Sequence, residues 1–354
     1  MLVDDTGALP LPWLAEPLAR ALATHRGHAL LVHGTPGVGA MAFALTLAQA
    51  WLCEGLTGAP RPCGHCGSCR LVQGRVHPDL TVLLPETLRR EHEWPLPDDR
   101  ADNDESKRKP SRQIRIDEVR LLIERLTRTS ARGRAKVALL HPADALNMQS
   151  ANALLKTLEE PAPGTRLLLT TSDPATLLPT VRSRCQVLRL AEPTADVALA
   201  WLQARGLPDA ADARVLLAAC SGRPLDALAM QIGGVDARTW AALPAAIASG
   251  NAAALTGWPV PRALDALLKL CHDALARATG GTSCYFPNGS VPAGAAPERL
   301  AAWSRELQRV ARHAEHPWNE ALLVEALVQG GSEALVRPVP RGHASGRGLD
   351  TLAR

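Results

Sequence analysis

The sequence predicts an α/β fold, a mostly parallel sheet with helices on both faces, followed by an all-helical C-terminal part. Three observations support this prediction. Short apolar runs typical of buried strands alternate with helical patterns up to about residue 190. One of these strands is followed by a glycine-rich turn and then a helix, over residues 28–52. Beyond Pro193 the strand patterns stop and helical spacing takes over.

The composition is that of an ordinary globular protein. The chain has 354 residues, enough for two or three domains, of which 46% are hydrophobic and 21% charged. No apolar run approaches the ~18–20 residues of a membrane span, and the first residues lack the basic region of a secretory signal. We therefore expect a cytoplasmic protein without a membrane partner. The net charge of +4 indicates a polyanionic partner only weakly.

The glycine-rich turn has the setting of a phosphate-binding loop, between a buried strand and a helix. Gly34, Gly37 and Gly39 keep the backbone scaffold of such a loop. A working loop ends with a lysine, which contacts the β- and γ-phosphates, and a serine or threonine, which binds magnesium. Ala40 and Met41 stand at these two positions. The scaffold is therefore present while its chemistry is absent.

A second loss matches the first. In nucleotide hydrolases with this loop, another strand of the sheet ends in acidic residues that hold magnesium and orient water. Here the apolar run 136–140 is followed by His141 and Pro142, and Asp144 comes three residues late. Two matching losses in separate segments favour a silent nucleotide site over a misassigned motif.

A group of clustered cysteines predicts a metal site. The group comprises Cys53, Cys63, Cys66 and Cys69. Four thiolates within 17 residues can surround one tetrahedral Zn²⁺, without an obvious open position, so we expect a structural role. An iron–sulfur cluster is the main alternative, but the bacterial ferredoxin pattern requires a further cysteine at position 73, which is Gln. Four reduced thiols remain a second alternative; His65 and His77 are possible substitute ligands.

The remaining elements follow in order. Residues 89–112 are polar and without periodicity, which predicts an exposed, disordered loop. Helical spacing at 117–128 and 149–160 alternates with apolar runs at 166–171 and 186–190, which continue the sheet. In the C-terminal part, the helical patterns span residues 194–205, 209–220, 261–278, 297–313 and 318–328.

Three segments together resemble the clamp-loader branch of the AAA+ ATPases. The segments are residues 152–161, 168–173 and 178–185. The resemblance runs from about residue 13 to 339, and a cysteine module after the loop helix is typical of the bacterial members. It implies an AAA+ domain at 1–190 with a zinc module at 53–69, a helical lid at 191–234, a helical collar for oligomerisation at 235–335 and a flexible tail at 336–354.

The resemblance also implies a role for Arg184. In clamp loaders, the arginine of a Ser-Arg-Cys motif is an arginine finger that reaches into the ATP site of the neighbouring subunit, where a guanidinium stabilises the transferring phosphoryl group. Ser183 and Cys185 would position it. Leu225 stands where an active loader subunit carries its sensor arginine, which would be a third loss.

A non-hydrolysing subunit of a DNA polymerase III clamp loader is the function that this resemblance implies. Such a subunit binds no nucleotide and works in DNA replication as an accessory to a holoenzyme, to which the nucleotidyltransferase activity belongs. The implied partners are ATP-hydrolysing subunits of the gamma or tau type and a clamp-opening subunit of the delta type, with the sliding clamp and primed DNA reached through the complex.

Two other functions are possible from the residues alone. The chain could be an ATPase with an atypical phosphate-binding loop, in which another basic residue or the backbone amides of residues 36–40 replace the lysine. Losing the lysine and both carboxylates removes most of the electrostatic stabilisation that such a reaction uses. The cysteine module could instead bind nucleic acid, but only Arg61, His65 and Arg70 lie near it, with no aromatic residue for stacking.

Overall fold

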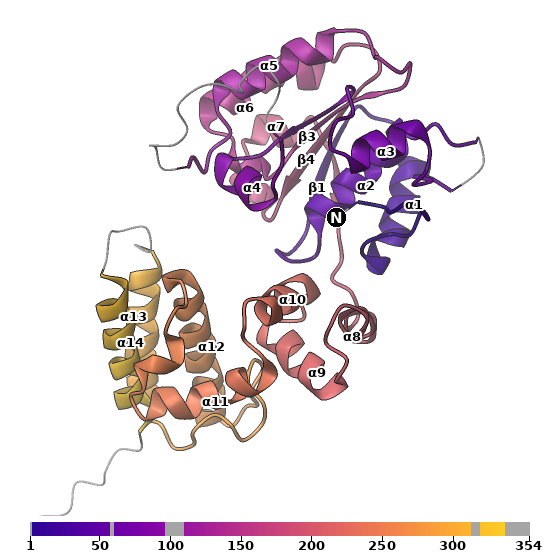
Figure 1. Cartoon of the computed structure of the whole chain (residues 1–354). Coiled ribbons are helices and arrows are strands. Elements are labelled where there is room, and N and C mark those ends of the chain that lie inside the picture. The colour runs from indigo at the N-terminus through magenta and orange to yellow at the C-terminus, as the bar shows by residue number, and fades with distance from the viewer. Residues whose placement is uncertain (1, 57–59, 96–109, 313–318, 337–354) are drawn as a thin grey trace, which may run out of the picture. The chain divides into compact units, whose positions relative to one another are not determined.

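The computed structural model describes residues 2–56, 60–95, 110–312 and 319–336 (Figure 1). They form two compact units. Unit 1 comprises Met1–Gly206 with Gly222–Asp226, and unit 2 comprises Leu207–Ser221 with Ala227–Arg354. The predicted division into an AAA+ domain, a lid and a collar stays a prediction. Among the described residues, no helix is both long and apolar enough to cross a membrane.

Unit 1 contains a parallel sheet of five strands in the order β2-β3-β4-β1-β5. The strands are β1 (Ala29–His33), β2 (Leu80–Leu83), β3 (Lys136–Leu140), β4 (Thr165–Thr171) and β5 (Gln186–Arg189). Strands β1, β3, β4 and β5 coincide with the predicted runs. A continuous apolar strand is the expected pattern for a parallel sheet with both faces covered, and the predicted fold class is confirmed.

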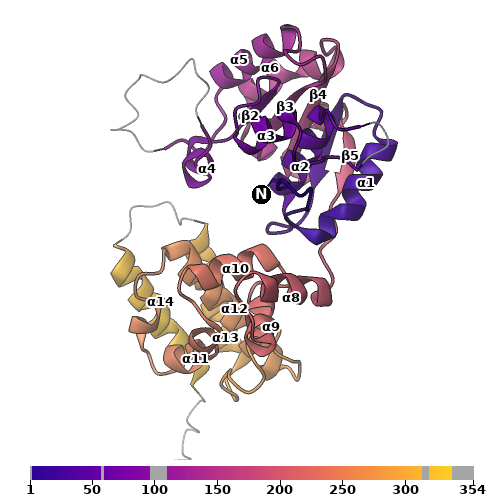
Figure 2. The same cartoon turned by 45° about the vertical axis from the view of Figure 1, so that its right-hand side comes forward.

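Helices cover both faces of this sheet. Those of unit 1 are α1 (Ala15–Thr24), α2 (Ala40–Leu52), α3 (Gly67–Gln73), α4 (Glu86–Glu91), α5 (Ile116–Thr127), α6 (Met148–Glu159), α7 (Pro179–Arg182) and α8 (Ala195–Ala204). Figures 1 and 2 show α5 and α6 side by side on one face, with α1, α2 and α3 on the other. Leu31 packs toward α5 and α6 against Leu122 and Leu154 in one apolar core.

The predicted loop at 89–112 is only partly described. Residues 89–91 belong to the short helix α4, and Arg89 pairs with Glu118 of α5 at 3.6 Å. This long-range ion pair holds a polar segment that shows no helical periodicity of its own. Residues 96–109 of the predicted loop lie outside the described residues.

Unit 2 is helical. Its helices are α9 (Ala210–Ala219), most of α10 (Pro224–Ile232), α11 (Ala237–Ala248), α12 (Val260–Ala278), α13 (Pro297–Ala311) and α14 (Glu320–Leu335). Helices α12, α13 and α14 pack against one another, and α11 packs against α14.

One predicted helix end in unit 2 is wrong. The pattern at 318–328 stops before Gly330 and Gly331, because glycine usually marks a helix end. Helix α14 instead continues to Leu335. The indole of Trp303 lies against both glycines, and a Cβ on Gly331 would come within 2.6 Å of Trp303 Cζ2. The two glycines therefore allow close packing of two helices and do not end α14.

Candidate functional site

The glycine loop (Gly34–Met41) connects β1 to α2, as its sequence predicts. Gly37 and Gly39 have φ angles of +81° and +98°, in the left-handed region that favours glycine. Helix α2 begins directly afterwards at Ala40, and Met41 is buried. The loop thus has the strand–turn–helix form of a phosphate-binding loop without a cation at its end.

Two carboxylates lie beside this loop. Thr35 Oγ1 donates a hydrogen bond of 2.6 Å to Glu192 Oε1. The carboxylate of Asp226 packs so closely on Gly37 that a Cβ there would lie 2.7 Å from Oδ1. Asp226 also pairs with Arg223 at 2.9 Å, which neutralises part of its charge. A nucleotide phosphate at this loop would meet negative side chains in place of the usual lysine.

The N-terminal segment packs on the same loop. Trp13 Nε1 donates a hydrogen bond of 2.8 Å to the carbonyl of Val38, and the side chain of Leu11 contacts Gly39. Trp201 in α8 contacts Trp13 edge to face and donates to the carbonyl of Pro10. The loop is therefore held by apolar and indole contacts within unit 1.

The end of β3 carries a neutral imidazole where a nucleotide hydrolase has acidic residues. His141 Nδ1 and Thr170 Oγ1 are 2.6 Å apart. Burial, with a smaller effect of His92, lowers the pKa of His141 to about 4. The ring is consequently uncharged at neutral pH. Asp144 lies in a short 3-10 helix, Ala143–Ala145, beyond the strand end.

Arg184 follows α7 and is held by its own chain. Its Nε donates a 2.7 Å hydrogen bond to Glu159 Oε1, and its Nη2 pairs with the same oxygen. Its Nη1 donates to the carbonyl of Thr180 at 2.9 Å. Ser183 Oγ also donates to Thr180, at 3.2 Å. Cys185 packs against the apolar core, and burial raises its pKa to about 11, which keeps the thiol neutral at neutral pH.

Sequence reasoning missed Glu159 as a partner of Arg184. The two residues are 25 positions apart, and no local pattern connects them. The Asn152–Pro161 segment that carries the family resemblance contains this glutamate. The resemblance of this segment to the family was therefore the one indication in the sequence that Glu159 could matter to the site.

The structure brings all four predicted cysteines together. Their sulfur atoms lie within 4.8 Å of one another. The distance from Cys63 Sγ to Cys69 Sγ is 3.9 Å, and that from Cys66 Sγ to Cys53 Sγ is 4.0 Å. A tetrahedron with Zn–S bonds of ~2.3 Å has sulfur–sulfur edges of about 3.8 Å. The group, called here the cysteine cluster, can therefore hold a metal ion.

The surroundings of the cysteine cluster suit thiolate ligands. Backbone N–H groups of Glu54, Gly55, Cys63 and Cys69 donate to the sulfurs at 3.4 Å. Burial raises the pKa of the Cys53 and Cys69 thiols, a cost that a bound cation removes because the ligands are thiolates. His65 is exposed, and both ring nitrogens of His77 are used by Ser68 and Asp79. Neither histidine belongs to the cluster.

Three further contacts fasten the cysteine cluster to the rest of unit 1. Glu54 forms two hydrogen bonds with Arg132, of 2.7 and 3.0 Å, and this pairing lowers the pKa of Glu54 to about 2. Gln73 Nε2 donates to the carbonyls of Val3 and Gly64. The cluster thus joins the N-terminal segment to the loop that precedes β3.

The chain is similar in sequence to known proteins of one family. The family model described as "DNA polymerase III, delta subunit" matches residues 13–194, about half of the chain. The chain belongs to this family. The DNA polymerase III subunit delta' of Escherichia coli K12 is 33% identical over 290 residues, which cover 76% of this chain and 78% of that protein. The expected clamp-loader family is confirmed, and the matches are to its delta-prime subunits.

Other relatives, of the delta-prime and tau types, match a shorter part of the chain. The subunit of Pseudomonas aeruginosa is 41% identical over 202 residues, 56% of this chain. The matched part spans about half, 54%, of that relative's length. The DNA polymerase III subunit tau of Escherichia coli K12 is 35% identical over 170 residues, which cover 48% of this chain and 22% of that protein. The family match contains the glycine loop, the cysteine cluster and Arg184, all within unit 1.

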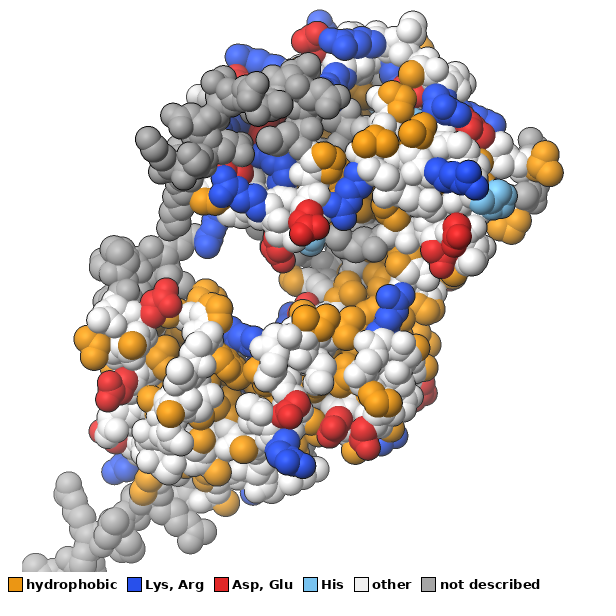
Figure 3. All heavy atoms as spheres, in the orientation of Figure 1, with side chains coloured by type: hydrophobic (Ala, Val, Ile, Leu, Met, Phe, Trp, Pro, Cys, Tyr) orange, Lys and Arg blue, Asp and Glu red, His pale blue; other side chains and the backbone are white. Residues whose placement is uncertain are grey.

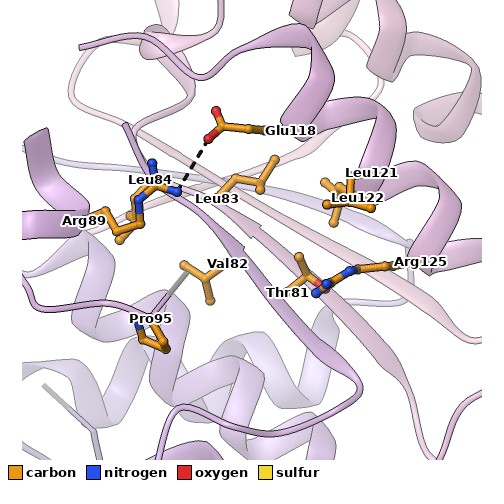
Figure 4. A pocket seen from close by; sticks show the side chains of 10 residues that line it. All are labelled: Thr81, Val82, Leu83, Leu84, Arg89, Pro95, Glu118, Leu121, Leu122 and Arg125. Carbon is orange, nitrogen blue, oxygen red and sulfur yellow. Dashed lines mark ion pairs between the residues drawn. The ribbon is translucent and has the colours of Figure 1, made fainter. Parts of the chain in front are cut away.

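A pocket beside the edge strand β2 is separate from these sites. It is lined by β2, by α5 and by Arg89 and Pro95, and Figure 4 shows Arg89 and Glu118 facing each other across it. None of the predicted site residues lines it.

A second group of possible metal ligands lies in unit 2. It consists of His272, Asp273 and Cys284. The buried Asp273 carboxylate already accepts hydrogen bonds from the backbone N–H groups of Cys284, Tyr285 and Phe286, each at 2.9 Å. This aspartate fixes a loop, and its lone pairs are largely used.

Proposed function

We propose that this chain is the non-hydrolysing, or stator, subunit of a DNA polymerase III clamp loader. In this role it supplies Arg184 in trans to the ATP site of a neighbouring subunit, so that the loader opens the sliding clamp and places it on primed DNA during replication. Its partners are ATP-hydrolysing subunits of the gamma or tau type and a clamp-opening subunit of the delta type. Membership of the delta-prime family supports these partners.

One contrast carries the proposal: among the described residues, the glycine loop supplies no cation of its own and the nearby Arg223 is paired with Asp226, whereas unit 1 presents a supported arginine elsewhere. At the glycine loop, Ala40 replaces the lysine, and Asp226 lies against Gly37. A phosphate there would lose the electrostatic stabilisation on which phosphoryl transfer depends. Arg184 is about one-third exposed and its guanidinium keeps its charge. A finger supplied in trans needs these properties.

Zinc has a structural part in this proposal. The sulfur geometry and the four thiol ligands favour Zn²⁺ in the cysteine cluster. All four positions would be taken by protein ligands, so a bound zinc would have no open site for chemistry. Its contribution would be to fix the chain between α2 and α3, which has little apolar core of its own.

A DNA-contacting role for the surface near the cysteine cluster receives little support. On the face of the described residues seen in Figure 3, lysine and arginine side chains are separated by apolar and acidic ones. Strong binding to a nucleic-acid backbone uses clustered cations. We therefore propose that DNA is reached through the assembled complex.

Nucleotide binding by the isolated chain tests the silent site. We expect calorimetric titration with ATP and Mg²⁺ to give no magnesium-dependent binding. If the chain bound ATP·Mg²⁺ in the micromolar range and hydrolysed it, the alternative of an ATPase with an atypical loop would replace the proposal.

Substitution of Arg184 tests the finger. In the complex with the ATP-hydrolysing subunits, Arg184→Ala should lower hydrolysis at the adjoining site by about 10³–10⁵-fold, the range for fingers in related systems. Arg182→Ala is the matched control, because Arg182 is exposed on the same turn. Single-turnover ATP hydrolysis measures the effect. Equal rates for the two variant complexes would contradict the finger.

A further inference from the structure

We propose that Glu159 is a positioning residue for Arg184. Its carboxylate holds one edge of the guanidinium and leaves the terminal edge for the phosphates of the neighbouring nucleotide. The inference rests on the proposed function, and it assigns a role to a residue outside the Ser-Arg-Cys motif. Three features support it: the rigidity of the helix end, the use of the guanidinium donors and the solvation of the carboxylate.

Glu159 lies at a well-anchored helix end. It is the last residue of α6, and Leu158 beside it is buried in the core of unit 1. His28 Nε2 lies 2.6 Å from the carbonyl of Leu158, which ties this helix end to the start of β1. Helix α6 also packs against α7, the helix that precedes Arg184. The carboxylate is therefore presented from a fixed backbone position.

The donors of Arg184 are divided between its own chain and a free edge. A guanidinium has five N–H groups in one plane. Nε and one N–H of Nη2 form the edge that faces Glu159 Oε1. Nη1 donates to Thr180 O at 2.9 Å and, more weakly, to Ser183 Oγ at 3.3 Å. Nη2 has no acceptor other than Glu159 in the described part of the chain, so its second N–H lies open at the terminal edge. A phosphate at this edge can accept from Nη2 and compete with Ser183 Oγ for Nη1.

This arrangement favours a positioning role for Glu159 over an inhibitory one, in which the glutamate would act as a trap for the arginine. A trap would occupy the phosphate-binding edge of the arginine, whereas Glu159 occupies the Nε edge. The Glu159 side chain is half exposed, so water screens its charge and the guanidinium stays available to an anion. A long side chain held in advance loses less freedom when it engages a partner. Misplacing a catalytic group by ~1 Å can cost about 100-fold in rate.

The test uses the assembled complex and compares Glu159→Ala with Glu160→Ala. Glu160 is the adjacent glutamate, also exposed, and within the described residues the carboxylate that Arg184 contacts is that of Glu159. We expect Glu159→Ala to lower the single-turnover rate at the adjoining ATP site by about 10–100-fold, with little change in the ATP concentration for half-saturation. Glu160→Ala should leave both quantities unchanged.

Two further variants make the result specific to Arg184. Glu159→Gln should restore part of the rate, because its amide oxygen can still accept from Nε. In the Arg184→Ala background, Glu159→Ala should have no additional effect, since the residue it positions is gone. Thermal unfolding of the isolated chain checks that each variant folds.

The outcomes separate this inference from the proposed function. If Arg184→Ala slows hydrolysis but Glu159→Ala behaves like Glu160→Ala, the positioning role is wrong and the finger stands. A faster rate in Glu159→Ala would show a trap and would also overturn the inference. If Arg184→Ala has no effect, the finger itself fails, and the role of Glu159 fails with it.

Discussion

The glycine loop and the cysteine cluster lie at opposite ends of the same helix, α2. They differ in whether the side chains could bind the ligand for which the backbone is shaped. At the N-terminal end, Gly37 and Gly39 preserve the turn of a phosphate-binding loop, but Ala40 and Met41 supply no ligand. At the C-terminal end, Cys53 begins a set of four thiols at metal-binding distances. The first end therefore has the backbone of a binding loop without ligating side chains, whereas the second has four side chains that could bind a metal ion.

The difference shows what each turn contributes to the fold. In the cysteine cluster, burial disfavours the free thiolates of Cys53 and Cys69, so a bound metal ion would stabilise this part of the chain. At the glycine loop, side chains of the same unit supply contacts: Leu11 and Asp226 pack on its glycines, and Trp13 donates a hydrogen bond to it. The form of the glycine loop is therefore supported by side chains of its own unit.

Removal of the metal should have the largest effect on stability. We expect Cys66→Ser to lower the metal content and to reduce the free energy of unfolding by about 4 kcal/mol at a free zinc concentration 1,000 times Kd. His65→Ala is the control, because His65 is exposed beside the cysteine cluster without belonging to it. Elemental analysis and denaturant unfolding measure both quantities. A variant with full metal content or unchanged stability would show that the cluster is no structural metal site.

Protonation of His141 should have the next largest effect, at the edge of the sheet where acidic residues are missing. The folded-state pKa of about 4 lies below the ordinary value of 6.5. The stabilisation by the neutral ring is complete above pH 6.5, and it is lost as the pH falls toward 4, because the unfolded chain binds the proton more readily. The loss amounts to about 2–3 kcal/mol.

The variant His141→Gln isolates the contribution of His141 protonation to the free energy of unfolding. Glutamine can still hydrogen-bond with Thr170 but does not titrate. Its free energy of unfolding should fall less between pH 7 and pH 4 than that of the unmodified chain, by about 2–3 kcal/mol. The pKa values of His25 and His77 are also lowered by burial, but they contribute equally to both proteins. Parallel pH profiles would contradict the neutral, buried ring.

Local patterns predicted the sheet and the metal ligands, and long-range contacts account for what they missed. The strands β1, β3 and β4 were predictable because each contains a run of buried apolar residues, and the cysteines because their spacing along the chain is that of a metal site. The continuation of α14 depends on Trp303, nearly 30 residues away. The partner of Arg184 is Glu159, on another helix. No periodicity or spacing encodes such pairs.

Substitution of Gly37 should have the smallest effect and tests the claim that the loop survives as a fold device. An alanine there must adopt the left-handed conformation, and its Cβ would lie 2.7 Å from Asp226 Oδ1. We expect Gly37→Ala to lower the free energy of unfolding by about 2 kcal/mol. In an Asp226→Ala background the steric part should vanish, leaving about 1 kcal/mol of backbone strain.

The double variant decides how the loop is held, because the two costs have different origins. Denaturant unfolding of the four proteins, namely the unmodified chain, both single variants and the double variant, gives the coupling between the two positions. A coupling of about 1 kcal/mol supports direct packing of the Asp226 carboxylate on the loop. If Gly37→Ala were neutral in both backgrounds, the left-handed turn would not be required, and the loop would be a remnant with no structural role.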